Sequence, residues 1–123
     1  MITRIRLINF NNGIIRRYSN LHQWVIPSQE DPNIFKLGYS KKTLDDLGRV
    51  TYINFNSQKG DIMREDAEIS SVESFKMIGQ LNAPFECKLV QNNEELAYVD
   101  NLWEVLENPE CETNSWIVEI EKL

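Results

Sequence analysis

Short runs of β-branched and aromatic residues, each ended by a turn-forming residue, constrain the fold of this chain more than any other feature. Runs of about four to eight such residues are typical of β-strands, whereas helices need longer periodic segments. From residue 22 onward we expect strands at residues 22–26, 34–39, 50–55, 68–72, 79–83, 85–90 and 116–120. The chain is therefore expected to be mainly β.

Two local signals interrupt these strands. Ser40 is placed to cap a short helix over residues 41–47, and Gly48 is placed to end it. The sequence Gln-Lys-Gly-Asp at residues 58–61 is a turn signal, because Gly60 can adopt a positive φ. The remaining long stretch, residues 92–107, is expected to be a polar helix or loop.

Size and charge limit the function classes. A chain of 123 residues with 41% hydrophobic residues can form one domain with a small core, and its apolar runs are too short to span a bilayer. The net charge is −6, and outside residues 1–17 there are 9 basic and 19 acidic residues, a net charge of −10. This charge makes nucleic acid a poor partner and favours basic protein surfaces.

The residue types of common catalytic and metal sites are scarce. Cys87 and Cys111 are the only cysteines and lack CxxC spacing, so we expect free thiols in a reducing compartment. His22 is the only histidine, which leaves too few ligands for an ordinary structural zinc site. It also gives no support for a Ser-His-Asp or Cys-His mechanism. We therefore expect a protein without an active site of its own.

The amino-terminal residues 1–17 differ from the rest. They combine four arginines and no acid with bulky apolar residues, as a mitochondrial presequence does, and Arg-Arg-Tyr-Ser at residues 16–19 resembles a matrix-protease site. The alternative is a basic arm or an edge strand, since three asparagines and a glycine within residues 9–13 interrupt any helix. We expect residues 1–17 to be a targeting or interaction arm of a mitochondrial-matrix protein, and residues 18–123 to be the folded domain.

Lys76 is the residue best placed to carry chemistry. It lies in the run Val-Glu-Ser-Phe-Lys-Met (residues 72–77), between the strand-like segments 68–72 and 79–83, which flank it like the arms of a hairpin. Connections between strands run over the surface, so this lysine is expected to be exposed. On composition alone, Lys76 would be an ordinary solvated lysine. The motifs that surround it indicate a functional role instead.

Five motifs resemble the H protein of the glycine cleavage system, in the biotinyl/lipoyl-domain family. In chain order they are His22-Gln-Trp-Val25, Leu47-Gly-Arg-Val-Thr-Tyr52, Val72-Glu-Ser-Phe-Lys76, Asn93 and Trp116-Ile-Val-Glu-Ile120. The third matches the family's Val-Glu-Ser-Val-Lys in four of five places. Each motif alone is unspecific, but their common order and spacing over residues 18–123 make the resemblance specific.

The resemblance implies a lipoyl/biotinyl-type barrel-sandwich, with two small antiparallel sheets packed face to face and short helices added. It also implies that Lys76 holds lipoate through an amide, which removes the lysine charge and leaves an extended tether. In this family the dithiolane accepts an aminomethyl group from the glycine decarboxylase, passes it to the aminomethyltransferase and is reoxidised by a flavin dehydrogenase. Family members also donate lipoyl groups to other enzymes, so glycine-cleavage and lipoyl-transfer enzymes are the implied partners.

Several positions depart from the family pattern. Gln23 replaces a glutamate, and Cys87 replaces a glycine, so the turn after Pro84 is expected to differ. Thr-Asn-Ser at residues 113–115 replaces the family's glycine-containing turn, and Pro109 and Cys111 stand in a loop of altered length. The chain ends at Leu123, where the family continues into a terminal helix.

These departures leave two alternatives open. The first is a non-catalytic accessory subunit of a large mitochondrial complex, respiratory or ribosomal, in which residues 1–17 would bind neighbouring chains. The second is a biotin carrier, which Met77 after the lysine favours and Phe75 before it disfavours. We favour the lipoyl carrier because an accessory subunit has no need to keep Glu73, Ser74 and Lys76 together.

Overall fold

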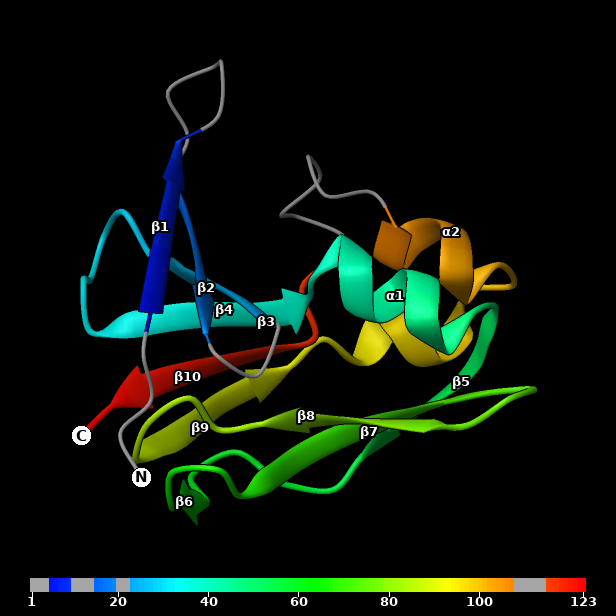
Figure 1. The fold of residues 1–123 in the computed structure, drawn as a ribbon. Helices are drawn as coiled ribbons and strands as arrows, with labels where there is room; N and C mark the ends of the chain where they lie inside the picture. Colours follow the sequence, from blue (N-terminus) through cyan, green and yellow to red (C-terminus); the bar gives the residue numbers. More distant parts are fainter. Residues whose placement is uncertain (1–4, 10–14, 20–22, 108–114) are drawn as a thin grey trace.

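The computed structural model describes residues 5–9, 15–19, 23–107 and 115–123. Within these residues the chain forms two antiparallel sheets, two short α-helices and one 3-10 helix (Figure 1). The larger sheet has the strand order β1-β2-β3-β4-β10-β9-β6, and the smaller sheet has the order β5-β7-β8. In Figure 1 the smaller sheet lies below the larger one, and the helices gather at the right.

The elements have the following bounds. The larger sheet contains β1 (Ile5–Asn9), β2 (Ile15–Ser19), β3 (Gln23–Pro27), β4 (Ile34–Tyr39), β6 (Ile62–Met63), β9 (Cys87–Asn92) and β10 (Val118–Lys122). The smaller sheet contains β5 (Val50–Phe55), β7 (Glu68–Ser74) and β8 (Ile78–Asn82). The helices are α1 (Lys41–Leu47), the 3-10 helix η1 (Glu94–Tyr98) and α2 (Leu102–Glu107).

The core lies between the two sheets. The fully buried side chains include Val25, Leu37 and Ile120 from the larger sheet, and Val72 and Leu81 from the smaller sheet. Buried and exposed residues alternate along the first part of β8, as expected for a strand with one face on the core. The expected barrel-sandwich of two antiparallel sheets is confirmed. Among the described residues, no helix is long and apolar enough to cross a membrane.

The locally specified elements form where the sequence predicts them. The Ser40 Oγ accepts a hydrogen bond from the Thr43 N–H at 3.3 Å and caps α1. Gly48 ends the helix with a φ of 78°, and its N–H donates to the Leu44 carbonyl at 3.0 Å. Gly60 has a φ of 93° in the turn after β5. Each of these contacts joins residues within four positions of one another, which explains why sequence alone predicts them.

Two strands begin later than expected. β9 (Cys87–Asn92) and β10 (Val118–Lys122) start two residues after the apolar runs that predict them. The first apolar residue of the β9 run, Phe85, stands on the connection before the strand and packs edge-on against Phe35, with ring centroids 5.2 Å apart. Phe85 is apolar because it packs against the core from a loop, so the apolar run is longer than the strand that forms.

The amino-terminal strands extend the larger sheet. β1 pairs antiparallel with β2, and β2 pairs with β3 through Arg17↔Val25 and Tyr18↔Trp24. β1 is the outermost strand of the larger sheet, so residues 5–9 form an edge strand, one of the two alternatives that the sequence left open for residues 1–17. The expected division between residues 17 and 18 falls inside β2.

Trp24 packs on a glycine across the β3–β4 ladder. Trp24 and Gly38 are paired in register, and the Trp24 side chain is 2% exposed. A Cβ at Gly38 would lie 2.2 Å from Trp24 Cζ2 and 2.3 Å from Cε2, which is well inside van der Waals contact. The missing side chain of Gly38 therefore makes the space that the indole fills.

Side chains of the larger sheet bond the free edge of the smaller one. The buried Gln23 amide donates from Nε2 to the Asn82 carbonyl at 2.7 Å and accepts at Oε1 from the Asn82 N–H at 2.8 Å. The Tyr39 hydroxyl donates to the Gly79 carbonyl at 3.1 Å. Side chains of β3 and β4 thus satisfy three backbone groups at the edge of the smaller sheet: the Asn82 N–H, the Asn82 carbonyl and the Gly79 carbonyl.

We predict that Gly38→Ala lowers the free energy of unfolding by about 1–3 kcal/mol, because the added methyl group must displace the indole of Trp24. Urea unfolding of the two proteins measures this difference. In a Trp24→Leu background, where the ring is absent, the same substitution should cost clearly less. An equal cost in both backgrounds would contradict the assigned contact.

We predict that Gln23→Glu makes stability depend on pH. A carboxylate cannot donate to the Asn82 carbonyl, so burial beside that oxygen should raise the folded-state pKa of the new carboxyl above its unfolded value of about 4.3. Stability relative to the wild type is then best below about pH 4 and is lost as pH rises through the folded pKa, reaching a deficit of about 3 kcal/mol or more at pH 7.

The measurement is urea unfolding of both proteins between pH 4 and pH 8. Gln23→Met is the matched control, because it loses both hydrogen bonds without adding a charge. Its deficit should stay constant across this range. A pH-independent deficit for Gln23→Glu would show that its carboxyl is not held against the Asn82 carbonyl.

Candidate functional site

Lys76 lies on the turn that joins β7 to β8. The last paired residues of the hairpin are Glu73 and Ile78, and Ser74 still belongs to β7. Phe75, Lys76 and Met77 form the connection, and the Lys76 side chain is exposed. The structure thus places the lysine on the hairpin turn that the sequence suggested.

Ser74 fixes the backbone of this turn. Its Oγ accepts from the Lys76 N–H at 3.2 Å and from the Met77 N–H at 3.2 Å, and its hydroxyl donates to the Met77 carbonyl at 3.2 Å. The Ser74 N–H donates to the same Met77 carbonyl at 3.0 Å. A serine that bonds the backbone two and three residues ahead stabilises a tight turn. The Lys76 backbone is therefore held in place while its side chain stays exposed to solvent.

The base of the hairpin is also rigid. Tyr39 and Gln23 bond Gly79 and Asn82 of β8, as described above. Burial, and to a smaller extent the Glu68 carboxylate, raises the pKa of the Tyr39 hydroxyl well above its ordinary value, so the hydroxyl keeps the proton that it donates. A Cβ at Gly79 would lie 2.7 Å from Leu47 Cδ2, so β8 packs directly on α1.

The Lys76 side chain folds against the end of α1. A Cβ at Gly48 would lie 3.6 Å from Lys76 Cε and 3.8 Å from Nζ, which places the lysine stem along the Gly48 backbone. The open carbonyls and the dipole at a helix C-terminus favour a nearby cation. The protonated Lys76 side chain is therefore attracted to the end of α1.

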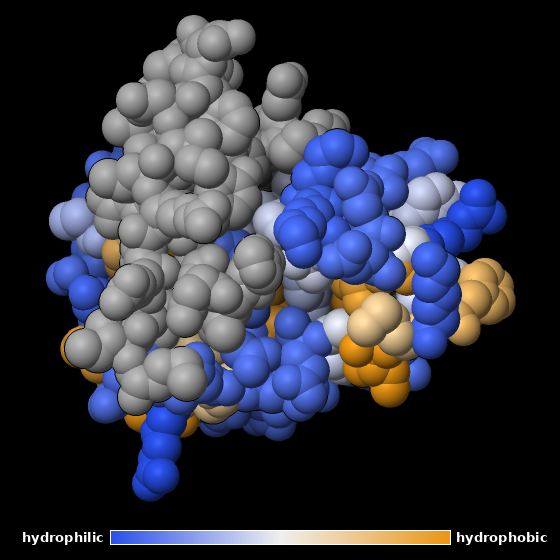
Figure 2. Space-filling model, in the orientation of Figure 1, coloured by the Kyte–Doolittle hydropathy of each residue, from blue (hydrophilic) through white to orange (hydrophobic). Residues whose placement is uncertain are grey.

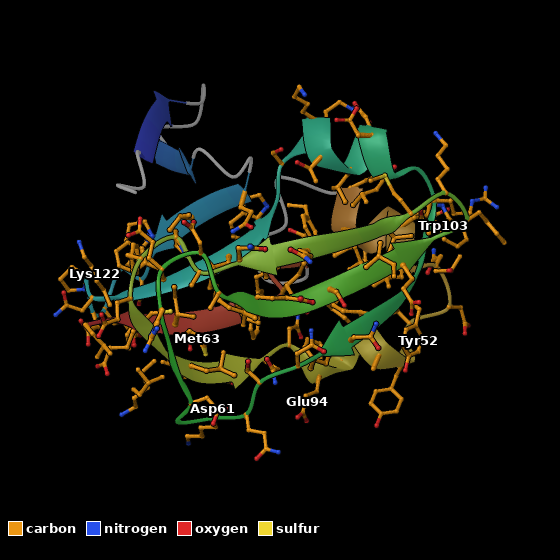
Figure 3. All side chains as sticks on the ribbon, turned by 60° about the horizontal axis from the view of Figure 1, so that its bottom comes forward. Tyr52, Asp61, Met63, Glu94, Trp103 and Lys122 are labelled. Atoms are coloured by element: carbon orange, nitrogen blue, oxygen red, sulfur yellow. The ribbon has the colours of Figure 1, made fainter. Side chains whose placement is uncertain are left out.

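Charged and aromatic side chains surround the hairpin turn. The Arg49 guanidinium stacks on the Trp103 ring, with Cζ 4.4 Å from the ring centroid. The Glu73 carboxylate accepts from Asn54 Nδ2 at 3.3 Å. Figure 3 shows Trp103 and Tyr52 at the same end of the molecule as the turn.

Several other residues that the sequence singled out are structural. Trp24 is in the core, and Asn93 directly precedes η1 and donates from Nδ2 to the Trp116 carbonyl at 2.8 Å. Cys87 is fully buried, and burial with the nearby Glu86 carboxylate raises the pKa of its thiol to about 12, so this thiol is inert at neutral pH. His22 and Cys111 lie outside the described residues.

The acidic side chains of α1 form surface ion pairs. Asp45 lies 3.7 Å from Lys41, and Asp46 lies 3.6 Å from Lys42. Within the part of the chain that the structure describes, no group of three or more His, Cys, Asp or Glu side chains could hold a metal ion.

Sequence analysis missed three residues that shape this site. Gly48 was expected to end a helix and stood in the second family motif, but its contact with Lys76 joins residues far apart in sequence and was not expected. Tyr39 stood in no motif, and Arg49 stood in the second family motif without a role of its own. A tyrosine at the end of a buried strand signals an unsatisfied hydroxyl that needs a partner, but the identity of that partner requires the fold.

The comparisons with known proteins agree with this geometry. The family model described as Glycine cleavage H-protein matches residues 16–122. The chain is 28% identical over 114 residues to the "Probable glycine cleavage system H protein" of Natronomonas pharaonis, covering 93% of this chain and 84% of the relative. It is 31% identical over 105 residues to the "Glycine cleavage system H protein" of Staphylococcus epidermidis, covering 85% and 77%.

A solved structure shows the same fold. The crystal structure of a glycine cleavage system H protein from Mycobacterium marinum superposes with a TM-score of 0.70 at 20% identity, covering 87% of this chain and 83% of that one. These matches favour the lipoyl carrier over the accessory-subunit and biotin-carrier alternatives. The chain belongs to the glycine cleavage H-protein family, whose members are lipoyl carriers without catalytic activity of their own.

Proposed function

We propose that Lys76 carries the lipoyl group of this chain as an amide on its Nζ, and that the arm shuttles an aminomethyl group, or the lipoyl group itself, between enzymes. The observation that carries this proposal is the exposed lysine on a turn whose backbone Ser74 fixes. When bound, the lipoyl group supplies a dithiolane that can accept and release a carried group. The protein supplies its position.

The residues around Lys76 hold its backbone in place and leave its side chain able to move. Ser74 holds the turn, and Tyr39 and Gln23 hold the strand behind it, so the arm has a fixed origin. The lysine stem and the attached chain can then sample several docking orientations from that origin without unfolding the hairpin. A fixed origin also raises the effective concentration of the arm at a docked enzyme.

The proposed partners are proteins: the glycine decarboxylase, the aminomethyltransferase, the flavin dehydrogenase and enzymes that transfer lipoyl groups. The net charge of −6 supports this choice, because an acidic carrier is steered towards basic surfaces around an enzyme's entrance.

We further propose that the protein works in the mitochondrial matrix and that residues 1–17 act as a targeting or interaction arm ahead of the carrier domain at 18–123. The support is compositional: four arginines and no acid among bulky apolar residues.

Intact-mass measurement tests the attachment site. Protein from the native source should be heavier than its sequence by one lipoyl amide, and Lys76→Arg should abolish the added mass because a guanidinium does not form this amide. Lys59→Arg is the matched control, since Lys59 is also an exposed lysine near a turn and should leave modification unchanged. Wild-type protein with an unmodified Lys76, or a Lys76→Arg protein that is still lipoylated, would refute the attachment site.

Imaging of the full chain with a carboxy-terminal fluorescent tag tests the location. The wild type should colocalise with a matrix marker. A variant with glutamine at the four arginines of residues 1–17 should remain in the cytosol, because import depends on their positive charge. A cytosolic wild-type protein would refute the proposed compartment while leaving the carrier function untouched.

A further inference from the structure

Aromatic side chains are exposed at the helical end of the molecule. Tyr98, the last residue of η1, is 86% exposed, and Tyr52 on β5 is 58% exposed. Trp103 on α2 is half-buried, and both η1 and α2 contact β5. We call residues 94–107 together with Tyr52 the η1–α2 surface. Large exposed aromatic groups that share one surface are typical of a protein-binding site.

The η1–α2 surface is acidic. Residues 94–107 contain no lysine or arginine and five exposed acidic residues: Glu94, Glu95, Asp100, Glu104 and Glu107. The two salt bridges that join described residues both lie on α1, so none of these five carboxylates forms a salt bridge within the described part of the chain. Figure 2 shows mainly hydrophilic residues at the upper right of the molecule, where Figure 1 draws the helices. A partner that is complementary to this surface is therefore basic.

An arginine already occupies part of this surface. The Arg49 guanidinium stacks on the Trp103 ring, with Cζ 4.4 Å from the ring centroid. A guanidinium can lie flat on an aromatic ring and donate hydrogen bonds to carboxylates from its edge, whereas a lysine ammonium is a point charge without this planar geometry. The rings and carboxylates of the η1–α2 surface are thus suited to arginine side chains, and Arg49 is an example of this contact within the chain.

The chain carries further arginines in one segment. Residues 1–17, which we call the arginine segment, contain four arginines and no acid. Within it, the β1–β2 register pairs Arg16 with Ile8 and Arg17 with Leu7. β2 also pairs with β3, which fixes these strands to the larger sheet at the left of Figure 1, whereas α2 lies at the right. These arginines therefore face the η1–α2 surface of another molecule and not that of their own chain.

We propose that the η1–α2 surface binds the arginine segment of a second copy of this chain, and that two such contacts close a two-fold dimer. This inference rests on the proposed role of residues 1–17 as an interaction arm, and it does not depend on lipoylation of Lys76. In each contact, arginines of one copy stack on Tyr98 and bond the carboxylates of the other. Because the segment and the surface lie at opposite ends of the molecule, an antiparallel two-fold arrangement joins both pairs of unlike ends.

The charges favour this pairing over the alternatives. The arginine segment has a charge of +4, and residues 94–107 have a charge of −5. Two arginine segments, or two η1–α2 surfaces, would bring like charges together. A single exposed contact between opposite charges is weak. Two contacts in a closed dimer are stronger, because the first contact holds the second pair at a high effective concentration.

Sedimentation velocity of the unmodified full chain tests the proposal. The wild type should be dimeric at about 100 μM protein in low salt and should dissociate towards about 1 M NaCl, where the Debye length falls to about 3 Å. The variant Arg6→Gln/Arg16→Gln/Arg17→Gln should be monomeric in low salt. The matched control, Lys59→Gln/Arg64→Gln/Lys88→Gln, removes the same three positive charges at exposed residues outside both sides of the contact and should stay dimeric.

Charge reversal identifies the two sides of the contact. The segment variant is Arg6→Glu/Arg16→Glu/Arg17→Glu, and the surface variant is Glu94→Lys/Glu95→Lys/Glu107→Lys. Each variant alone should be monomeric, because like charges then meet in both contacts. An equimolar mixture should form a heterodimer, since each contact again joins opposite charges. A surface variant that still dimerises alone would place the interface elsewhere and overturn the inference.

Tyr98→Ser tests the aromatic part of the contact without disturbing the fold. Since Tyr98 is 86% exposed, the variant should keep the wild-type Tm, while the dissociation constant of the dimer should rise about tenfold. An unchanged dissociation constant, or a wild type that is monomeric in low salt, would overturn the inference. Neither result bears on Lys76, whose modification is read from intact mass. A monomeric chain that is still imported through its arginines would leave residues 1–17 a targeting segment alone.

Discussion

The hydrogen bonds between the larger sheet and the free edge of β8 are the constraint on which the functional end of this protein depends. Gln23 and Tyr39 bond the backbone of Asn82 and Gly79, so an edge strand that could pair with another chain is occupied from within. The same bonds prevent β8 from sliding along β7, because a shift in register would break them. A turn at the end of such a hairpin keeps one position relative to the core.

That fixed position explains how a small domain can present a long arm without an active site. Most of the ordering cost is met by core packing and by the contacts of Ser74, so the backbone of Lys76 loses no further freedom when an enzyme docks. The side chain retains its freedom, apart from its contact with Gly48. The Lys76 backbone is thus fixed, and the atoms beyond its Cα can move.

Sequence alone predicts the parts of this structure that depend on neighbours in the chain. The cap at Ser40, the helix end at Gly48 and the bounds of β5 follow from contacts or patterns within a few residues. The position of Lys76 on a hairpin followed from the two flanking strands, but its chemical importance came only from resemblance to a family. The partners of Tyr39 and Gln23 lie 40 and 59 residues away, and a linear pattern does not encode such a pairing. The predicted starts of β9 and β10 were wrong because residues ahead of a strand, such as Phe85, can be apolar in order to pack against the core.

Some residues that depart from the family pattern are buried in the core, and others are exposed on the surface. Gln23 is buried, and its amide bonds the Asn82 N–H and carbonyl, so this departure is satisfied inside the chain. Cys87 is buried at the start of β9, paired with Met63, where a side chain adds to the core that a glycine would leave unfilled. Phe75, in contrast, meets almost nothing within the chain. A buried departure must be matched by residues of the same protein, whereas an exposed aromatic such as Phe75 can be matched only by another molecule. Phe75 is therefore the departure whose side chain is free to contact a partner.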